Sequence, residues 1–589
     1  MIRLIFLCIV LTFSLAFSAI SKDFSVMDFG AVADGKTDCT SAFQNALDEA
    51  AKIGGGTVHV PTGDFAIRGN LIIKSGVFLQ GTFKAPSTNR NDHQALASKG
   101  QNGSLILAYA GKGDPDGKPF ITLEGSNNGL IGLIIYYPEW SQEEVPPIPY
   151  PPCIAGFIGD CQSVIDCLLQ NPYEGMRFVG TGRVFIRNVF GYPIKRGLLI
   201  DQCYDISRVE NCHFWPFGVN YVATDPYCEW INKNGIAFEF ARTDWQYVIN
   251  TFCFGYGAGY KFSEYEHGGC NGNFLGIGAD SCKYAVLVEA SQDPGILITN
   301  GEFVGRWSSR DSVPLEIKET AKGKVSIVNS SFWGPIDTSI RTESDAFLSV
   351  IGCHFQDWDV NNNDTPAITL KKGNVIIQGN TFNDKPKHIS IGKDVNSAII
   401  TGNMAIDALN IDNNIGNKAQ IALNKPGNPL PTGNELISYI LILGKDLDTK
   451  YVKNFYPAEA GGEFKEKDRK RWSSGDAKII LPVKKNTKYN VSFQIYMPEF
   501  ALKSGAGIYL NGKNILPINE AGEQTLTAQV STGSSEKLTF EIKVNEWKPQ
   551  DFIPENVDTR VIGIGVREIK FVSNSKEKIF DFNTMKYIN

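Results

Sequence analysis

Carboxylates with acid–base potential gather between residues 235 and 289 of this chain, on two consecutive copies of one short segment. The three at outward or segment-end positions are Glu239, Asp244 and Glu264. Cleavage of a glycosidic bond uses two carboxyl groups, one to protonate the leaving oxygen and one as base or nucleophile. On neighbouring strands such groups would stand about 4.8 Å apart, where like charges make one of them keep its proton more readily. The spacing therefore predicts that the catalytic acid and base are among these three residues.

Cations and aromatic rings accompany these carboxylates and indicate what would be bound. The six that we expect to hold a sugar are Arg242, Lys261, His267, Tyr260, Trp140 and Tyr150. Basic and phenolic side chains also supply what a β-eliminating lyase needs, namely a base and a cation that neutralises a uronate carboxyl. The same residue types are common on any solvated face, and the rings of Trp140 and Tyr150 suit a cover over the core as well as a sugar. The residues alone leave hydrolysis, elimination and non-catalytic glycan binding open.

A short pattern of alternating apolar residues recurs through the middle of the chain and ends each time in phenylalanine. Clear copies are residues 184–190, 296–303, 325–332 and 375–382. Successive closing phenylalanines, from Phe303 to Phe382, are about 23 to 29 residues apart, a period typical of a solenoid, and the alternation indicates strands. We therefore predict an all-β, right-handed parallel β-helix. The recurrent asparagine before each phenylalanine, such as Asn300, is expected to satisfy buried backbone groups at a turn.

The segment before these repeats predicts a cap for the solenoid. Apolar residues at 43, 46, 47 and 50 have helical spacing, Thr40 or Ser41 can cap the helix, and a run of glycines from Gly54 ends it. The strings DFGA at 28–31, ADGKTD at 33–38 and GGGTV at 54–58 resemble the opening segment of the pectate-lyase superfamily. That resemblance implies a parallel β-helix related to polygalacturonase-like and rhamnogalacturonase-like hydrolases, to lyases, to an epimerase and to phage tailspikes. The catalytic motifs of the polygalacturonase-like hydrolases are not intact, so their mechanism is not carried over.

Composition divides the chain into four parts. Residues 1–19 have the charge, apolar run and small residues of a signal peptide, which predicts a secreted protein. Residues 20–425 hold the β-helix, the Pro- and Gly-rich residues 426–435 are a predicted linker, and 436–589 are a predicted accessory β-sandwich. Arg471-Trp472 and Asp558-Thr559-Arg560 resemble elements of carbohydrate-associated sandwich modules. We favour internal ion pairs over sugar binding for these residues, because both elements lie within strand-like segments.

Charge and cysteine usage exclude several classes of protein. The formal net charge is −6 and the sequence pI about 5.7, which argues against a nucleic-acid partner. No segment after the leader is long and apolar enough to span a membrane. The cysteines contain no CxxC pair, so we expect mostly buried thiols and no zinc site.

These observations converge on a secreted, monomeric protein whose partner is a polysaccharide. The first choice is a glycoside hydrolase, and the alternatives are a lyase on a uronate-rich polymer and a non-catalytic glycan-binding protein. No metal and no cofactor are expected, with Ca²⁺ reserved for the case of elimination.

Overall fold

The computed structural model describes residues 23–84, 103–383, 385, 387–405, 409–426, 438–444, 448–458, 469–553, 556, 558–573, 579–581 and 586–588. The predicted signal peptide lies outside these residues, and so does the predicted linker apart from its first residue. The chain divides into two compact units. The first comprises Met1–Asn220, Gly235–Phe252 and Tyr265–His267, and the second comprises Tyr221–Asn234, Cys253–Glu264 and Gly268–Asn589.

Three parallel sheets build the first unit, and successive strands of the chain enter them in turn. The first sheet contains β5 (Leu71–Ile73), β8 (Ile121–Glu124), β11 (Pro152–Ile158), β13 (Glu174–Val179), β15 (Arg196–Asp201) and β18 (Ile236–Phe240). The second contains β1 (Phe24–Ser25), β3 (Gly56–His59), β6 (Val77–Gln80), β9 (Gly129–Ile131), β12 (Ser163–Gln170), β14 (Phe185–Gly191), β16 (Arg208–Glu210) and β19 (Thr243–Ile249). The third contains β2 (Asp34–Asp38), β4 (Gly63–Ile67), β7 (Ser104–Ala108), β10 (Leu133–Tyr136), the last residues of β12 and β14, and β17 (His213–Phe214). This winding is the predicted parallel β-helix.

The second unit continues the same three-sheet pattern. Its first sheet contains β21 (Ala258–Phe262), β24 (Tyr284–Val288), β27 (Leu315–Ile317), β30 (Ile340–Thr342), the first parts of β33 (Ile368–Gln378) and β35 (Ile389–Thr401), and β37 (Ile411–Asn413). Its second contains β22 (Cys270–Leu275), β25 (Ile296–Thr299), β28 (Lys324–Val328), β31 (Phe347–Ile351), the later parts of β33 and β35, and β38 (Ala419–Ala422). Its third contains β23 (Gly278–Cys282), β26 (Glu302–Gly305), β29 (Ser331–Trp333), β32 (His354–Phe355), β34 (Thr381–Phe382), β36 (Met404–Ala405) and β39 (Lys425–Pro426).

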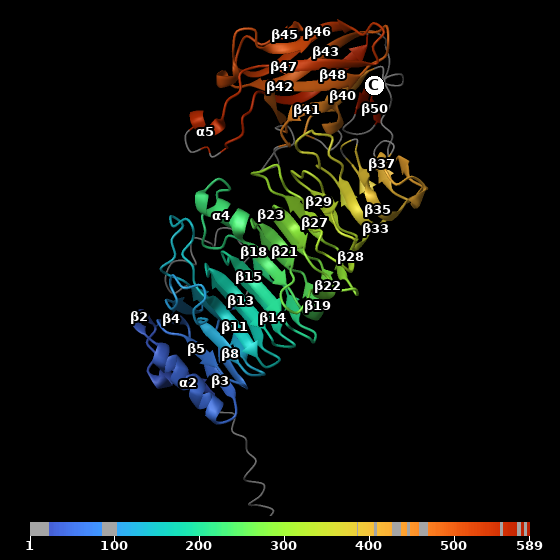
Figure 1. Ribbon diagram of the computed structural model, residues 1–589. Coiled ribbons are helices and arrows are strands. Elements are labelled where there is room, and N and C mark those ends of the chain that lie inside the picture. The colour runs from blue at the N-terminus through green and yellow to red at the C-terminus, as the bar shows by residue number, and fades with distance from the viewer. Residues whose placement is uncertain are drawn as a thin grey trace, which may run out of the picture. The chain divides into compact units, whose positions relative to one another are not determined.

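An amphipathic helix packs at the start of the first unit. Helix α2 (Thr40–Lys52) buries Phe43 and Leu47 against strands that include β3 and β5 (Figure 1). Its first turn is bound by Asp38, whose Oδ1 accepts hydrogen bonds from the Thr40 backbone N–H and hydroxyl. The predicted capping residues Thr40 and Ser41 are therefore the first two residues of the helix. The side chain that binds the helix end is that of Asp38, two residues before Thr40. The second helix of note, α4 (Pro226–Asn234), belongs to the second unit.

Two asparagine ladders occupy the turns, and only one of them has the predicted role. Asn300 and Asn329 are exposed and left-handed, with φ of 56° and 48°, so they serve a tight turn and do not satisfy buried groups. The buried ladder is Asn380, Asn403 and Asn424, whose Nδ2 atoms donate to the carbonyls of Val350, Ile377 and Ile400 at 3.0–3.1 Å. The prediction for Asn300 was wrong because Asn300 stands three residues before its phenylalanine, at the turn, whereas the core residue Asn380 stands two residues before Phe382 and follows the left-handed Gly379.

The recurrent phenylalanines close the core of the solenoid as expected. Phe332 stacks on Phe355 and Phe355 stacks on Phe382, each with 4.9 Å between ring centroids. Eleven cysteines are free thiols, and all of them except Cys161 are buried. Within the described residues no helix has both the length and the hydropathy needed to cross a bilayer.

The chain after residue 438 folds into antiparallel strands around a core of its own. One sheet contains β41 (Val452–Phe455), β42 (Arg471–Pro482), β44 (Gly507–Leu510), β45 (Lys513–Pro517) and β47 (Lys537–Lys543). The other contains β40 (Tyr439–Ile442), β43 (Lys488–Met497), β46 (Gly522–Ser531), β48 (Gly565–Ser573), β49 (Ile579–Asp581) and β50 (Lys586–Ile588), and β42 pairs with β48 to link the two. The chain forms a tight hairpin at Asn511-Gly512, where Leu510 pairs with Lys513.

Candidate active site

A buried charge cluster lies on the outer face of the first sheet in the first unit. Leu198 of β15 and Phe238 of β18 point into the core, so the residue that follows each of them along its strand points outward. Glu239 is one of these, and Glu174 and Arg196 pair in register at the starts of β13 and β15. Although they are on the outer face, Glu174 and Glu239 are almost fully covered.

One arginine holds both glutamates. The Arg196 Nε atom donates to Glu174 Oε1 at 3.1 Å and its Nη1 atom to Glu239 Oε2 at 2.8 Å. The Arg177 Nε atom donates to the same Glu174 oxygen at 2.9 Å. Burial works against a charged guanidinium, but the charges of Glu174 and Glu239 outweigh it and hold the pKa of Arg196 above its ordinary value. The arrangement fixes two positive charges at one place on the sheet.

Tyr265 completes the cluster and is its most exposed member. Its hydroxyl donates to Glu239 Oε1 at 3.1 Å and lies 3.5 Å from Arg196 Nη1. The side chain is 46% exposed, whereas Glu239 behind it is 1% exposed. Burial of the hydroxyl and the neighbouring charge of Glu239 raise the pKa of Tyr265 to about 12. Tyr265 is therefore protonated at neutral pH, and we call these five residues, Glu174, Arg177, Arg196, Glu239 and Tyr265, the glutamate–arginine cluster.

The other predicted catalytic residues are not part of this cluster. Asp244 forms an ion pair with Arg242, and the Arg242 guanidinium lies 5.0 Å from the centroid of the Tyr204 ring. Glu264 is exposed and belongs to the second unit. Of the three predicted carboxylates, Glu239 is the one that belongs to the cluster, where it contacts Arg196 and Tyr265.

The predicted sugar-binding residues have three different environments. Lys261, in the second unit, pairs with Glu289 at 3.1 Å, and His267 is exposed in the first. Trp140 is partly exposed. None of these positions by itself decides for or against contact with a sugar.

Two tyrosines predicted to bind sugar are core residues. Tyr260 is fully buried and its hydroxyl donates to the carbonyl of Gly278 at 3.3 Å. Tyr150 packs edge-on against Tyr137 with ring centroids 4.9 Å apart, and its burial raises its pKa to about 12. The prediction of sugar contact was wrong for both tyrosines, because each ring is packed inside the protein and is not exposed to a ligand.

Sequence reasoning missed the two residues that organise the cluster. Arg196 and Tyr265 lie 43 residues before and 26 residues after Glu239 in the chain. Tyr265 stands between Glu264 and Glu266, and a half-exposed aromatic ring among acidic residues was the available signal. Arg196 is the first residue of β15, and nothing in the repeat pattern marks that position as functional.

A second acidic group lies on the third sheet of the second unit. Burial, with a smaller effect of the charge on Glu302, raises the pKa of Asp280 to about 6, and hydrogen bonding to Ser281 and Trp307 offsets part of this shift. The Trp333 indole N–H donates to Glu302 Oε1 at 3.1 Å, and the rings of Trp307 and Trp333 lie edge to face at 6.4 Å. A carboxyl whose pKa is raised to about 6, beside a carboxylate and two indoles, has the composition of a hydrolytic site. Across the described ranges, no group of three or more His, Cys, Asp or Glu side chains has the geometry to hold a metal ion.

Comparison with known proteins supports the resemblance found in the opening segment. Residues 24–122 match the family "Rhamnogalacturonase A/epimerase, pectate lyase-like". The chain is 48% identical over 66 residues to alginate lyase 7 of Azotobacter vinelandii, covering 10% of this chain and 8% of that protein. It is 41% identical over 122 residues to the mannuronan C5-epimerase AlgE4 of the same organism (19% and 21%), and 30% identical over 133 residues to a probable rhamnogalacturonase A of Aspergillus niger (20% and 29%). The chain thus spans less than a third of the length of these relatives.

Solved structures with a similar course of the chain share little sequence with it. The A-module of AlgE4 from Azotobacter vinelandii aligns with a TM-score of 0.38 at 14% identity, covering 69% of this chain and 96% of that one. A DFA-IIIase from Arthrobacter chlorophenolicus A6 in complex with GF2 aligns with a TM-score of 0.42 at 12% identity, covering 69% and 99%.

Proposed function

We propose, from the family match over the opening segment and the chemistry of the glutamate–arginine cluster, that this chain cleaves a uronate-containing polysaccharide by β-elimination. The observation that carries the proposal is a protonated, half-exposed Tyr265 held beside Glu239 and Arg196. Relatives of the opening segment are named for alginate, mannuronan and rhamnogalacturonan, all of which contain uronic acids. This replaces hydrolysis, our first choice from sequence, as the preferred reaction.

The two arginines suit the carboxyl group of a uronate. In elimination, the proton on the carbon next to that carboxyl passes to a base from solvent water, and its electron pair forms the new carbon–carbon double bond. The bond to the neighbouring glycosidic oxygen breaks, and this oxygen takes up a proton from the catalytic acid. The first step builds negative charge on the carboxyl, which fixed cations stabilise. Arg177 and Arg196 are both partly exposed beside covered glutamates, so their unoccupied faces are directed to solvent. Arginine binds carboxylates in a two-pronged geometry, which also orients the sugar ring.

Tyr265 suits the last step. A phenol with a pKa of about 12 keeps its proton at neutral pH, and it is still a stronger acid than the sugar alcohol that forms when the departing alkoxide is protonated. Glu239 does not reach solvent and therefore acts through Tyr265, by fixing the direction of its hydroxyl. In this proposal Tyr265 is the catalytic acid and Glu239 is a positioning residue.

The test uses Tyr265→Phe, which removes the hydroxyl and keeps the ring. We expect turnover on the best substrate to fall by a factor of about 100 or more, as for other general acids, with an unchanged melting temperature. The matched control is Tyr204→Phe, because Tyr204 is an exposed tyrosine of the same unit that contacts Arg242 and not the cluster. Equal activity of Tyr265→Phe and wild type would refute the assignment.

Glu239→Gln provides a second readout. Since the charge of Glu239 contributes to the raised pKa of Tyr265, its removal should lower that pKa. The alkaline limb of the pH–rate profile should then move to lower pH. A profile of unchanged shape would show that Tyr265 is not the group that titrates there.

Hydrolysis remains a second candidate because of Asp280. Its pKa of about 6, with Glu302 and two indoles nearby, is the environment in which one carboxyl donates a proton and another stays ionised. The two functions differ in their products. Alginate, polygalacturonate and rhamnogalacturonan are incubated with the protein, and ultraviolet absorbance of a new carbon–carbon double bond indicates elimination. New reducing ends without that absorbance, abolished by Asp280→Asn and not by Tyr265→Phe, would establish hydrolysis instead.

A further inference from the structure

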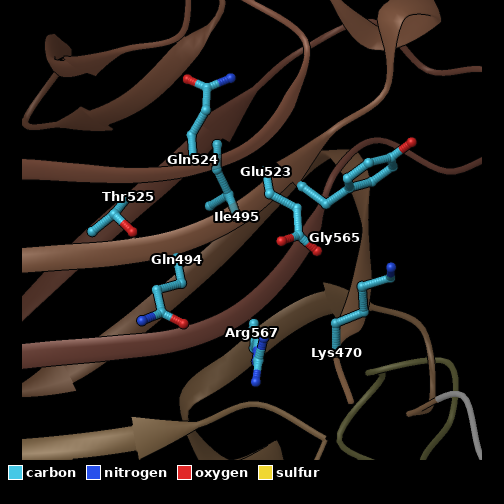
Figure 2. Close-up of a pocket in the computed structure, with 9 residues that line it drawn as sticks. Lys470, Gln494, Ile495, Glu523, Gln524, Thr525, Gly565 and Arg567 are labelled. Atoms are coloured by element: carbon cyan, nitrogen blue, oxygen red, sulfur yellow. The ribbon is translucent and has the colours of Figure 1, made fainter. Parts of the chain in front are cut away.

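A pocket of about 280 Å³ opens on the antiparallel sheet of the C-terminal part, remote in sequence from both clusters described above. Strands β43, β46 and β48 and the residue before β42 supply its lining. Gln494, Glu523 and Arg567 surround one open space, with Lys470 at its edge (Figure 2). Tyr496 also lines the pocket. In sheet register, Gln494 is paired with Thr525 and Tyr496 with Glu523, so these side chains share one face of the sheet.

A β-bulge places the arginine in this pocket. Gln494 pairs with Glu568 and the next residue, Ile495, pairs with Val566, so Arg567 is an extra residue with no partner on β43. A bulge of this kind turns the side chain of the extra residue away from the direction that regular alternation would give it. Bulges are features that re-aim side chains at functional places, and here the re-aimed residue is a cation.

A glycine leaves the room for the second cation. Gly565 pairs with Tyr496 on β43 and with Trp472 on β42. A Cβ atom at Gly565 would lie 2.8 Å from the Cδ of Lys470, closer than such atoms approach one another. The bare backbone therefore lets the Lys470 stem lie across the sheet, with its ammonium 4.9 Å from the centroid of the Tyr496 ring.

The charges of the pocket are available to a ligand. In the described part of the chain neither Arg567 nor Lys470 forms an ion pair, although Lys470 contacts two aromatic rings. By contrast, Arg471 is buried against Asp448 and Arg560 pairs with Asp558. Those two arginines, which the sequence offered as alternatives between sugar binding and structure, have the structural environment. Two cations and Glu523 leave the pocket with one net positive charge.

We infer that this pocket binds a single uronic acid residue of an acidic polysaccharide and does not catalyse a reaction on it. The two-pronged guanidinium of Arg567 matches a carboxylate. Glu523 can accept hydrogen bonds from ring hydroxyls, and the Gln494 amide can donate to them. The exposed ring of Tyr496 offers an apolar face to the sugar. A monoanion fits the net charge, whereas a neutral sugar would leave both cations without a partner. The inference does not rest on the proposed elimination, because the pocket residues lie outside the catalytic cluster.

The test measures binding by calorimetry on the full chain, in a Tyr265→Phe background that suppresses turnover during the titration. The probes are hexamers of galacturonate, mannuronate and guluronate, with cellohexaose as the neutral control and a sulfated, carboxyl-free oligosaccharide as the anionic control. We expect at least one hexauronate to bind, cellohexaose not to bind, and the sulfated control to bind more weakly. Arg567→Gln and Lys470→Met should each weaken the hexauronate by tenfold or more.

The matched control variant is Lys513→Gln, which removes one charge from an exposed hairpin of the same part of the chain. It should bind as the background protein does. The inference is overturned if no hexauronate binds, if cellohexaose or the sulfated control binds equally well, or if Lys513→Gln weakens binding as much as Arg567→Gln. Because Arg567→Gln affects only binding here and Tyr265→Phe only turnover, failure of one proposal leaves the other intact. Melting temperatures of all variants exclude loss of fold as the cause.

Discussion

Replacing Arg196 by methionine should be strongly destabilising, because one side chain neutralises two buried glutamates. Glu174 and Glu239 both accept hydrogen bonds from Arg196, and neither is open to water. Methionine keeps the aliphatic part of the side chain and removes the charge. In the variant, Glu174 retains Arg177, whereas Glu239 loses Arg196 and keeps the hydrogen bond from the Tyr265 hydroxyl.

The expected cost follows from this difference. Breaking a buried ion pair by removing one partner costs about 3–5 kcal/mol, since the remaining charge is left in a poorly solvating place. Glu239 loses its arginine whereas Glu174 keeps Arg177, so we expect about 3–5 kcal/mol in total, within the range for one pair. The matched control is Arg183→Met. Arg183 pairs with Asp160 and Asp205 but is 53% exposed, and such surface pairs contribute about 0–1 kcal/mol.

The assay is urea denaturation at neutral pH, followed by the change in tryptophan fluorescence of both variants and wild type. Adding Glu239→Gln to Arg196→Met removes the carboxylate charge that has lost its arginine, and it should return part of the lost stability. If Arg196→Met is no less stable than Arg183→Met, the two glutamates are solvated in the folded protein. That result would also remove the basis for treating Tyr265 as a group held by a rigid cluster.

Three further predictions test the core and its titrating groups. Burial raises the folded-state pKa of Asp280 from 3.8 to about 6, so wild type should lose stability as pH rises through that window, by about 3 kcal/mol for 2.2 pK units; Asp280→Asn should be the more stable protein at pH 8 and equal to wild type below about pH 4 in urea titrations, and a pH-independent difference would contradict the burial of this carboxyl. Burial lowers the pKa of His213 to about 4 from 6.5, so its contribution is complete above pH 6.5 and is lost as pH falls toward 4; His213→Gln should flatten the acid side of the stability curve, and a curve as steep as that of wild type would be inconsistent with a buried neutral imidazole. Asn403→Ala should cost about 1–3 kcal/mol because it leaves the Ile377 carbonyl without its donor, whereas Asn300→Gly should be tolerated within about 0.5 kcal/mol at a left-handed exposed turn; equal thermal shifts for these two variants would mean that the two ladders are not distinct.

The repeat was readable from sequence because it is a local pattern. Each strand needs only alternating apolar residues, and each rung, meaning one turn of the solenoid, buries them against the rung before and after. The stacked rings of Phe332, Phe355 and Phe382 follow from one residue type recurring at one place in the rung. Helix α2 was equally local, since its apolar spacing lies within thirteen residues.

The site was only partly readable because it depends on register. Arg196 follows Glu174 by 22 residues, but Ile236, its partner on the next strand, follows by 40, since a longer insertion separates β15 from β18. A one-residue change in that insertion would turn Glu239 from the outer face to the core. The sequence showed that Glu239 alternates with core residues, which was sufficient to place it outward. It did not show that Arg196 would reach it from one side and Tyr265 from the other.

Sequence by itself thus determined the rung, the cap and the candidacy of Glu239, because each rests on residues that are neighbours along the chain. Tertiary structure decided which polar groups are covered and which face solvent. Tyr260 and Tyr150 became core residues, and Tyr265 became the accessible end of a buried ion cluster. In the C-terminal part it was likewise a bulge, and not a motif, that directed Arg567 into a pocket. The physical reason is the same in each case: burial and charge neutralisation are properties of chain segments brought together in space, and insertion lengths and bulges set which segments meet.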